Sequence, residues 1–437
     1  MIVSPAFRGK RYAVLGLARS GLATVRALVA SGAEVSIWDT NVDVREAAVD
    51  SVIELSIGLD AASLTVADPL EIDLTSFDGV VVSPGVPINR HPITDKAHAA
   101  NVPLIGDIEL FSQARPGLPL HKVIGITGTN GKSTTTALIH HIIETAGVPA
   151  RLGGNIGLPI LGQDPLPEGG VYVLELSSYQ IDLCHALDCD IAVLLNITPD
   201  HLDRYDGFAD YAASKERLFT MQHVDKVAVI ATEDDRTRMI ASRVNHRLMR
   251  VSSKQVGDQS RWPSLQGPHN AQNVAAARAV AEVLGIKAAT VEEGLLTYPG
   301  LPHRMERVRE LGGVLYVNDS KATNPTSTAP ALAAYPAIHW ILGGRAKTRE
   351  LDACAPHFDH VRAAYTIGEA GPMFAALLKD KMPVSECGLL GDAVVAASRA
   401  AVAGETVLLS PACASFDQFR DFEARGDAFR LAVEALA

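Results

Sequence analysis

The stretch Gly125-Ile-Thr-Gly-Thr-Asn-Gly-Lys-Ser-Thr134 decides the central fold of this 437-residue chain. Apolar residues lead into a glycine-rich turn, and Lys132, Ser133 and Thr134 then open a helical pattern. In such a loop the backbone N–H groups point into one concavity, the lysine neutralises phosphate charge, and a hydroxyl holds Mg²⁺. The strict Walker spacing needs a glycine where this chain has Ile126, so the loop is P-loop-like. We therefore predict a nucleotide phosphate site here.

The composition fits a large globular protein and excludes several classes of protein. The chain is 47% hydrophobic and 20% charged, which is enough apolar material for several domains with real cores. We see no apolar run near the roughly 18 residues of a membrane span and no signal-peptide pattern, so we expect a cytoplasmic location. The net charge of −11 offers no basic field for nucleic acid. Five cysteines without C-x-x-C spacing indicate reduced, packed thiols.

The chain alternates between strand-like and helix-like patterns in three segments that are separated by Pro- and Gly-rich joints. We predict an α/β protein of three domains. They are a Rossmann-like N-terminal domain (1–106), a central P-loop-like ATPase domain with a mostly parallel sheet (107–302), and a Rossmann-like C-terminal domain (303–437). The clearest expected strands are 12–16, 34–39, 171–176, 191–196, 227–231, 314–317, 340–344, 363–368 and 406–410, and 79–87 is expected to be a buried strand that breaks into a tight turn.

The first turn, Gly16-Leu-Ala-Arg-Ser-Gly21, together with Asp39 at the end of the next strand, invites a dinucleotide-dehydrogenase interpretation. The position where the backbone must approach a pyrophosphate is Ala18 in this chain, which disfavours that class. The geometry still suits a nucleotide, with its diphosphate near the helix N-terminus and Asp39 accepting from a ribose or base. A nicotinamide oxidoreductase remains an alternative that NADH binding would test.

Two residues of the central segment follow apolar strands, Glu175 and His201. The carboxyl ends of parallel strands form the edge where open α/β sheets bind ligands, and the phosphate loop emerges there too. Carboxylate and hydroxyl oxygens suit Mg²⁺, and a neutral imidazole completes a second metal site. Lys215 follows on the expected helix after His201, where it either faces the same ligand-binding cleft at this edge or is an ordinary surface lysine. A non-catalytic nucleotide-binding module, in which Lys132, Glu175 and His201 are structural, also remains open.

Polar residues gather at further expected strand and helix ends. Asn270 and Asn273 stand one turn apart at the start of an alanine-rich helix, where they form an N-cap cluster or recognise adenine. Arg304 offers a fixed cation near a joint. Charge and hydroxyl donors for a ligand that bears carboxylates come from Lys321, Thr323, Lys347 and Ser415.

Eight motifs occur in order along nearly the whole chain. They are TGTNGKST (127–134), GGNIG (153–157), LELSSYQ (174–180), NITPDHLDRY (196–205), GPHNAQN (267–273), LPHRME (301–306), NDSKATN (318–324) and LSPACASFDQFRDFEARGDAF (409–429). This series resembles the signatures of the Mur ligase family. The last two motifs are similar to the branch that adds D-glutamate, rather than to branches that add alanine, a diamino acid or a dipeptide. A folylpolyglutamate synthetase, which shares the loop and the ligation chemistry, is the alternative.

The resemblance implies an ATP-dependent amide ligase of cytoplasmic peptidoglycan precursor synthesis. A substrate carboxylate would attack the γ-phosphorus to give an acyl phosphate, and the incoming amine would then displace phosphate. Two Mg²⁺ ions and Lys132 would stabilise the transferring phosphoryl group. The substrates would be UDP-N-acetylmuramoyl-L-alanine on the first domain, ATP on the second and D-glutamate on the third. A monomer without a nucleic acid partner is expected.

The resemblance also implies a role for each matching residue. The catalytic residues would be Lys132, His201 and Lys215, and Lys215 would be carbamylated by CO₂. The metal ligands would be Ser133, Thr134, Glu175, His201 and Lys215. ATP would contact Gly128, Thr129, Asn130, Gly131, Lys132, Ser133, Thr134, Asn270, Arg304 and Asp319. The UDP substrate would contact Ser20, Asp39, Thr40, Ser83, Gly85 and Asn155. D-glutamate would contact Thr323, Lys347, Ser415 and Phe422.

The chain departs from the family pattern at two places. Asn41 stands where an arginine often follows the Asp-Thr pair, so the resemblance does not assign that charged contact to the uridine moiety. The segment 343–347 lacks the usual acidic residue before Lys347, which leaves the supporting contacts of that lysine undefined.

Overall fold

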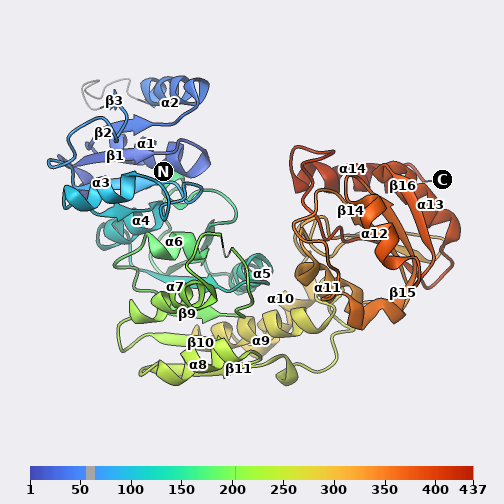
Figure 1. The fold of residues 1–437 in the computed structure, drawn as a ribbon. Helices are drawn as coiled ribbons and strands as arrows, with labels where there is room; N and C mark the ends of the chain where they lie inside the picture. Colours follow the sequence, from blue (N-terminus) through green and yellow to red (C-terminus); the bar gives the residue numbers. More distant parts are fainter. Residues whose placement is uncertain (56–63, 202, 437) are drawn as a thin grey trace. The chain divides into compact units, whose positions relative to one another are not determined.

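The computed structural model describes residues 1–55, 64–201 and 203–436, and residues 56–63, Leu202 and Ala437 lie outside the described residues. The described part contains three sheets of five, six and six strands, with helices packed around them (Figure 1). The predicted α/β class with mostly parallel sheets is confirmed. The chain divides into two units, Met1–Ser252 with Ala275–Glu293, and Ser253–Val274 with Gly294–Ala437. The predicted three-domain boundaries at 106 and 302 stay a prediction.

The first sheet has the strand order β3-β2-β1-β4-β5, and all of its pairs are parallel. The order reverses between β1 and β4, which is the switch point where open α/β sheets form a ligand crevice. Its strands are β1 (Arg11–Leu15), β2 (Glu34–Trp38), β3 (Leu64–Val66), β4 (Gly79–Val82) and β5 (Leu104–Ile105). Its helices are α1 (Arg19–Ala30), α2 (Val42–Leu55), α3 (Ile93–Ala99) and α4 (Asp107–Ala114).

The second sheet has the order β11-β10-β9-β6-β8-β7 and is also parallel. Its strands are β6 (His121–Thr127), β7 (Ala150–Gly154), β8 (Gly170–Glu175), β9 (Ile191–Leu194), β10 (Val227–Ala231) and β11 (Arg247–Val251). The helices of this region are α5 (Lys132–Thr145), α6 (Ser178–Asp182), α7 (Phe208–Thr220), α8 (Asp235–Arg243), α9 (Pro268–Val283) and α10 (Ala288–Thr297). Strand β6 lies between β8 and β9, so the three strands that precede the predicted central-site residues are neighbours.

The third sheet has the order β12-β13-β17-β14-β15-β16. Only the β12–β13 pair is antiparallel within the described chain. The strands are β12 (Glu306–Leu311), β13 (Val314–Asn318), β14 (Ile338–Gly343), β15 (Val361–Ile367), β16 (Val384–Gly388) and β17 (Thr406–Leu409). The helices are α11 (Pro325–Ala333), α12 (Gly371–Leu378), α13 (Leu390–Ala400) and α14 (Phe422–Glu434).

Alternation along β14 builds a core on each face of the third sheet. Trp340 and Leu342 pack with residues of α11 and α12, whereas Ile341 packs with residues of α13 and α14. A strand that is covered on both faces is a continuous apolar run, and β14 is buried along its whole length. Because helices cover both faces of this sheet, polar side chains of its inner strands are found mainly at the strand ends.

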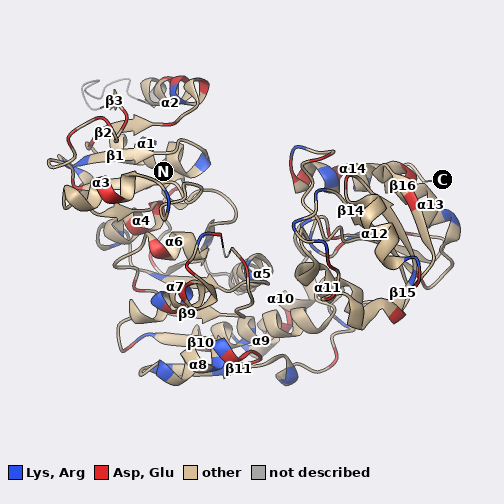
Figure 2. Cartoon of the chain, viewed as in Figure 1, with Lys and Arg blue, Asp and Glu red and all other residues tan. Residues whose placement is uncertain are grey.

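The structure also describes the cysteines and the lengths of the helices. The five cysteines are free thiols, and four of them are buried. No described helix combines the length and the apolar character that crossing a bilayer requires. Figure 2 shows basic and acidic segments interspersed over the helices and loops of each sheet.

Candidate active site

The phosphate loop joins β6 to α5 and depends on two glycines. Gly128 has φ 147° and Gly131 has φ 83°, a region that favours glycine. A Cβ on Gly128 would lie 3.1 Å from the Cβ of Leu195. Lys132 Nζ donates to the carbonyl oxygens of Gly128 and Thr129, each at 2.8 Å. The lysine is thus held over its own loop, as a phosphate cradle requires.

The residues after β9 hold the loop in place. Asn130 N donates to Asn196 Oδ1 at 2.8 Å, and Asn196 Nδ2 donates to the Asn130 carbonyl at 3.1 Å. Thr129 Oγ1 accepts from Thr198 N at 3.0 Å and lies 3.1 Å from the Tyr211 hydroxyl. Sequence reasoning missed Asn196, Thr198 and Tyr211. A polar residue directly after a buried apolar strand was the available signal for Asn196.

Glu175 ends β8 as a buried carboxylate with only one oxygen satisfied. Its side chain is 2% exposed, and Oε1 accepts from Asn155 Nδ2 at 2.8 Å. Oε2 is buried and has no hydrogen-bond partner in the described part of the chain. An unpaired buried carboxylate oxygen is costly, and a bound cation would satisfy it. The donor set suits Mg²⁺, because buried Ser133 opens α5 next to β6, the strand that pairs with β8.

Gly154 explains how Asn155 comes to lie beside Glu175, and it supports a prediction about stability. It has φ 88°, and a Cβ there would lie 2.2 Å from the Glu175 carbonyl oxygen. We expect Gly154→Ala to cost about 2 kcal/mol or more, because strain and a backbone clash act together. The measurement is the midpoint of thermal unfolding. Gly169→Ala is the matched control, since Gly169 has φ 83° but nothing within 4 Å of the added Cβ. Equal midpoints for the two variants would contradict the clash.

Lys215 lies on α7 and is only 1% exposed, so the surface-lysine interpretation is wrong. Its Nζ lies 4.6 Å from the centroid of the Tyr211 ring. Burial lowers the pKa of Lys215 well below its ordinary value, and the charge of Lys132 lowers it further. The carboxylates of Asp200, Asp182 and Glu175 act in the opposite direction. Lys215 therefore loses its proton and becomes a neutral amine at lower pH than an exposed lysine does.

His201 lies in the loop after β9 in a strained backbone conformation. Its φ is 53°, in the left-handed region that non-glycine residues rarely adopt. The side chain is about half exposed, at 47%, and the ring centroid lies 5.2 Å from that of Tyr179. The Cζ of Arg204 lies 4.5 Å from the same Tyr179 ring, and Arg204 donates to the Gly85 carbonyl at 3.1 Å. This arrangement connects the His201 loop to the turn after β4.

The loop lysine, Glu175, His201 and Lys215 thus belong to one edge of the second sheet. Tyr211 connects the loop with Lys215 and His201, because its hydroxyl lies 3.1 Å from Thr129 Oγ1 of the loop, and its ring centroid lies 4.6 Å from Lys215 Nζ and 6.4 Å from the His201 ring centroid. Among the residues that the structure describes, no three His, Cys, Asp or Glu side chains group closely enough to hold a metal ion.

Three strand ends of the first sheet come together through Asp39 and Ser83. Asp39 Oδ2 accepts from Leu17 N at 2.9 Å, and Oδ1 accepts from Asn41 N at 3.0 Å. Ser83 Oγ donates to the Gly16 carbonyl at 2.7 Å. These contacts join the loops at the switch point. Thr40 and Gly85 lie in the loops after β2 and β4, and Ser20 lies in the first turn of α1. Asn155 belongs instead to the second sheet, beside Glu175.

A cation does lie near the position of Asn41. The Cζ of Arg45 lies 4.3 Å from the Trp38 ring centroid, and its Nη1 donates to the Asp39 carbonyl. Arg45 is one helical turn beyond Asn41 on α2. Sequence reasoning missed it because that reasoning looked only at the position next to the Asp-Thr pair.

The predicted ATP residues divide between the two units, with the phosphate loop in one and Asn270, Arg304 and Asp319 in the other. The side-chain amide of Asn270 already has hydrogen-bond partners in its own segment. Its Nδ2 donates to the Gln266 carbonyl at 2.9 Å, and its Oδ1 accepts from Asn273 at 3.0 Å. Asp319 is buried and accepts from Ser410 Oγ at 2.8 Å. Burial raises the pKa of Asp319 to about 7.

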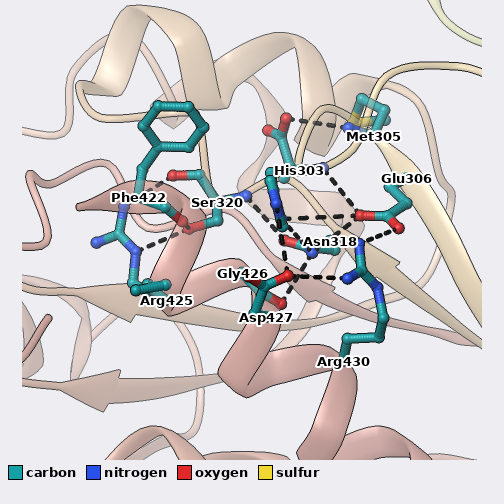
Figure 3. A network of polar contacts seen from close by, with 12 residues as sticks. His303, Met305, Glu306, Asn318, Ser320, Phe422, Arg425, Gly426, Asp427 and Arg430 are labelled. Atoms are coloured by element: carbon teal, nitrogen blue, oxygen red, sulfur yellow. Dashed lines mark hydrogen bonds and ion pairs between the residues drawn. The ribbon is translucent and has the colours of Figure 1, made fainter. Parts of the chain in front are cut away.

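A polar network fixes the segment that carries Arg304 to the third sheet (Figure 3). Asn318 Nδ2 lies 3.0 Å from His303 Nδ1, and it donates to Glu306 Oε2 and to the Gly426 carbonyl, each at 3.1 Å. Glu306 also pairs with Arg430 of α14 at 2.7 Å. The contacts of His303 and Glu306 therefore anchor the chain on both sides of Arg304.

The predicted D-glutamate residues all follow strands of the third sheet. Thr323 comes after β13, Lys347 after β14 and Ser415 after β17, and these strands are neighbours. Phe422 begins α14, and Lys321 Nζ lies 3.9 Å from its ring centroid. The structure thus brings Lys321 to the same edge.

Three profiles of known families match most of the chain, and all three describe Mur ligases. Residues 10–106 match the profile described as "Mur ligase MurD-like, N-terminal domain". Residues 126–264 match "Mur ligase middle domain", and residues 303–413 match "Mur ligase, glutamate ligase domain".

Relatives of similar length bear one name, UDP-N-acetylmuramoylalanine–D-glutamate ligase. The protein of Novosphingobium aromaticivorans is 64% identical over 441 residues, covering 100% of this chain and 97% of its own length. That of Sphingopyxis alaskensis is 62% identical, with 100% of both chains covered.

Solved structures share the fold at much lower identity. MurF ligase of Thermotoga maritima, solved in complex with ADP, has a TM-score of 0.63 at 14% identity and covers 100% of this chain and 96% of its own. A bifunctional folylpolyglutamate synthase/dihydrofolate synthase of Yersinia pestis has a TM-score of 0.53 at 18% identity. It covers 76% of this chain and 93% of its own. The folate-ligase alternative therefore shares the fold alone.

Proposed function

The chain belongs to the Mur ligase family, and on that premise we propose that it joins D-glutamate to UDP-N-acetylmuramoyl-L-alanine by using ATP. It is an ATP-dependent ligase of peptidoglycan synthesis, the pathway on which cell wall formation, cell shape and division depend. The observation that carries the proposal is 64% identity, over the full length, to a protein named for this reaction. The enzyme works in the cytoplasm as a monomer.

The reaction needs activation because a carboxylate has no good leaving group. The lactoyl-linked alanine carboxylate attacks the γ-phosphorus of ATP, ADP leaves, and an acyl phosphate results. The amine of D-glutamate attacks the acyl carbon, phosphate leaves, and the amine proton passes to solvent. Lys132, held over the phosphate loop, neutralises charge on the phosphoryl oxygens during the first step.

Two Mg²⁺ ions would lower the charge of the phosphates when bound. Glu175 with Ser133 or Thr134 would hold the nucleotide ion, and His201 would hold the second. The unsatisfied Oε2 of Glu175 supports the first assignment. Asn155, which donates to the other oxygen of Glu175, orients the carboxylate.

Lys215 would act as a carbamate. Its neutral amine attacks CO₂, a C–N bond forms, and one proton is released. The product carries a negative charge where the lysine carried a positive one, so it assists in binding the second ion. Burial of Lys215 and the lowered pKa that follows from it support this chemistry.

Glu175→Gln is expected to raise the Mg²⁺ concentration for half-maximal activity by about tenfold or more, because a neutral amide is a weak ligand for a hard cation. Turnover would be titrated with MgCl₂ at saturating substrates. Glu168→Gln is the control, since Glu168 is exposed in the loop before β8. An unchanged Mg²⁺ requirement in Glu175→Gln would contradict the ligand assignment.

The test of the reaction is phosphate release from ATP in the presence of UDP-N-acetylmuramoyl-L-alanine. We expect turnover when D-glutamate is added and little when it is omitted or replaced by L-glutamate. A folate substrate in place of the muramoyl substrate should support no turnover. Turnover with folate, or indifference to D-glutamate, would overturn the proposal.

A further inference from the structure

Arg425 is the largest buried cation of the third sheet and its helices. It lies in the first turn of α14, and its side chain is 1% exposed. Within the described residues, its hydrogen bonds go to backbone carbonyls and to a hydroxyl, and none goes to a carboxylate. A buried guanidinium without a carboxylate partner is costly, so its oxygen partners must replace its water completely.

The guanidinium joins the carboxyl ends of three neighbouring strands. Nε donates to Ser320 Oγ at 3.0 Å and Nη2 to the Ser320 carbonyl at 2.8 Å, just after β13. Nη2 also donates to the Cys413 carbonyl at 3.0 Å, after β17. Nη1 lies 3.5 Å from the Gly343 carbonyl at the end of β14. Figure 3 shows the Ser320 part of this arrangement, with Phe422 beside it.

The same loops are tied to one another and to the start of α14. Ser320 Oγ donates to the Phe422 carbonyl at 2.8 Å. Arg345 and Ala414 exchange backbone hydrogen bonds of 2.9 and 3.0 Å, which pairs the loop after β14 with the loop after β17. A Cβ on Gly344 would lie 2.4 Å from the Ala414 carbonyl oxygen, so the backbones of the two loops lie too close together for a side chain at that position.

We propose that Arg425 is a positioning residue for the amino-acid substrate. It fixes, through its planar fork, the loops that carry Thr323, Lys347 and Ser415, without touching the substrate. The inference rests on the proposed function, because it takes those residues as the D-glutamate site. A guanidinium suits the task because its donors diverge in one plane toward separate acceptors, which a lysine ammonium cannot reproduce.

Arg425→Met and Arg425→Lys test the proposal in the full-length enzyme. We expect the KM for D-glutamate to rise by about tenfold or more in both variants, because small displacements of several contacts weaken substrate binding together. The KM for UDP-N-acetylmuramoyl-L-alanine should change by no more than about twofold. Thermal unfolding and circular dichroism would be recorded for each variant.

Arg309→Met is the matched control. Arg309 Nη1 also donates to backbone carbonyls, those of Val433, Glu434 and Leu436, but it does so at the far end of α14. We expect this control to lower thermal stability and to leave the KM for D-glutamate unchanged. A purely structural role for Arg425 would give the same pattern in Arg425→Met and would overturn the proposal. A wild-type KM in Arg425→Lys would likewise overturn a role for the fork.

Ser320→Ala keeps the proposal testable if Arg425 variants do not fold. It removes the hydroxyl between Arg425 and Phe422 but leaves the guanidinium with its carbonyl partners. A selective rise of a few-fold in the KM for D-glutamate is expected, and no rise would count against the proposal. Absence of D-glutamate-dependent turnover in the wild-type enzyme would overturn the proposed function instead.

Discussion

Lys132→Ala is expected to lower kcat by about 10³-fold, because the transferring phosphoryl group would lose the side-chain cation that the loop supplies to neutralise its charge. The structure already holds Nζ over the loop through two hydrogen bonds of 2.8 Å. ATP would move the ammonium group from these carbonyls to phosphate oxygens, which are stronger acceptors. The measurement is D-glutamate-dependent phosphate release at saturating ATP.

Lys122→Ala is the control for this substitution. Lys122 lies on the same strand, β6, but its side chain is exposed. It should retain wild-type turnover. If Lys132→Ala retained turnover within about twofold of wild type, the lysine would be structural and a non-catalytic nucleotide-binding module would become the better interpretation.

The local sequence was sufficient to predict the inner strands of each sheet and most strand-end residues, but the edge strands β3, β5, β7, β11, β12 and β16 were not predicted. Buried parallel strands are continuous apolar runs, so Glu175 and the 409–429 motif stood out directly after such runs. The edge strand β12, with the sequence Glu-Arg-Val-Arg-Glu-Leu, was not predicted because its charged residues obscure the strand pattern. Its pairing with β13 is a tertiary contact that the local pattern does not contain.

The local sequence patterns did not predict which charged side chains are buried. Lys215 and Arg425 look like surface residues in the sequence, since charged residues are rarely buried completely. What buries them is the convergence of loops from different strands, as Ser320 and Cys413 do around Arg425. Hence the spacing of Lys215 left its role open, and Arg425 appeared only as one letter of a family motif.

Lys215→Arg is expected to lower kcat by about 10²-fold or more, because an arginine keeps the positive charge but cannot take up CO₂. The control is Lys226→Arg. Lys226 Nζ pairs with Asp190 at 2.9 Å. An arginine should keep this ion pair, so we expect Lys226→Arg to leave kcat unchanged. Isotope-labelled bicarbonate would report the carbamate directly by NMR in the wild-type enzyme, and Lys215→Arg should lack that signal.

The pH dependence follows from the environment of Lys215. Burial and the charge of Lys132 lower its pKa, so the neutral amine and its carbamate persist to lower pH than for an exposed lysine. As pH falls through the lowered pKa, the amine takes up a proton, and both the carbamate signal and activity should be lost together. Lys132→Ala removes the neighbouring positive charge and should therefore shift the loss of the carbamate signal to higher pH. A carbamate signal that does not change with pH, or whose pH dependence Lys132→Ala does not shift, would contradict this account of the Lys215 pKa.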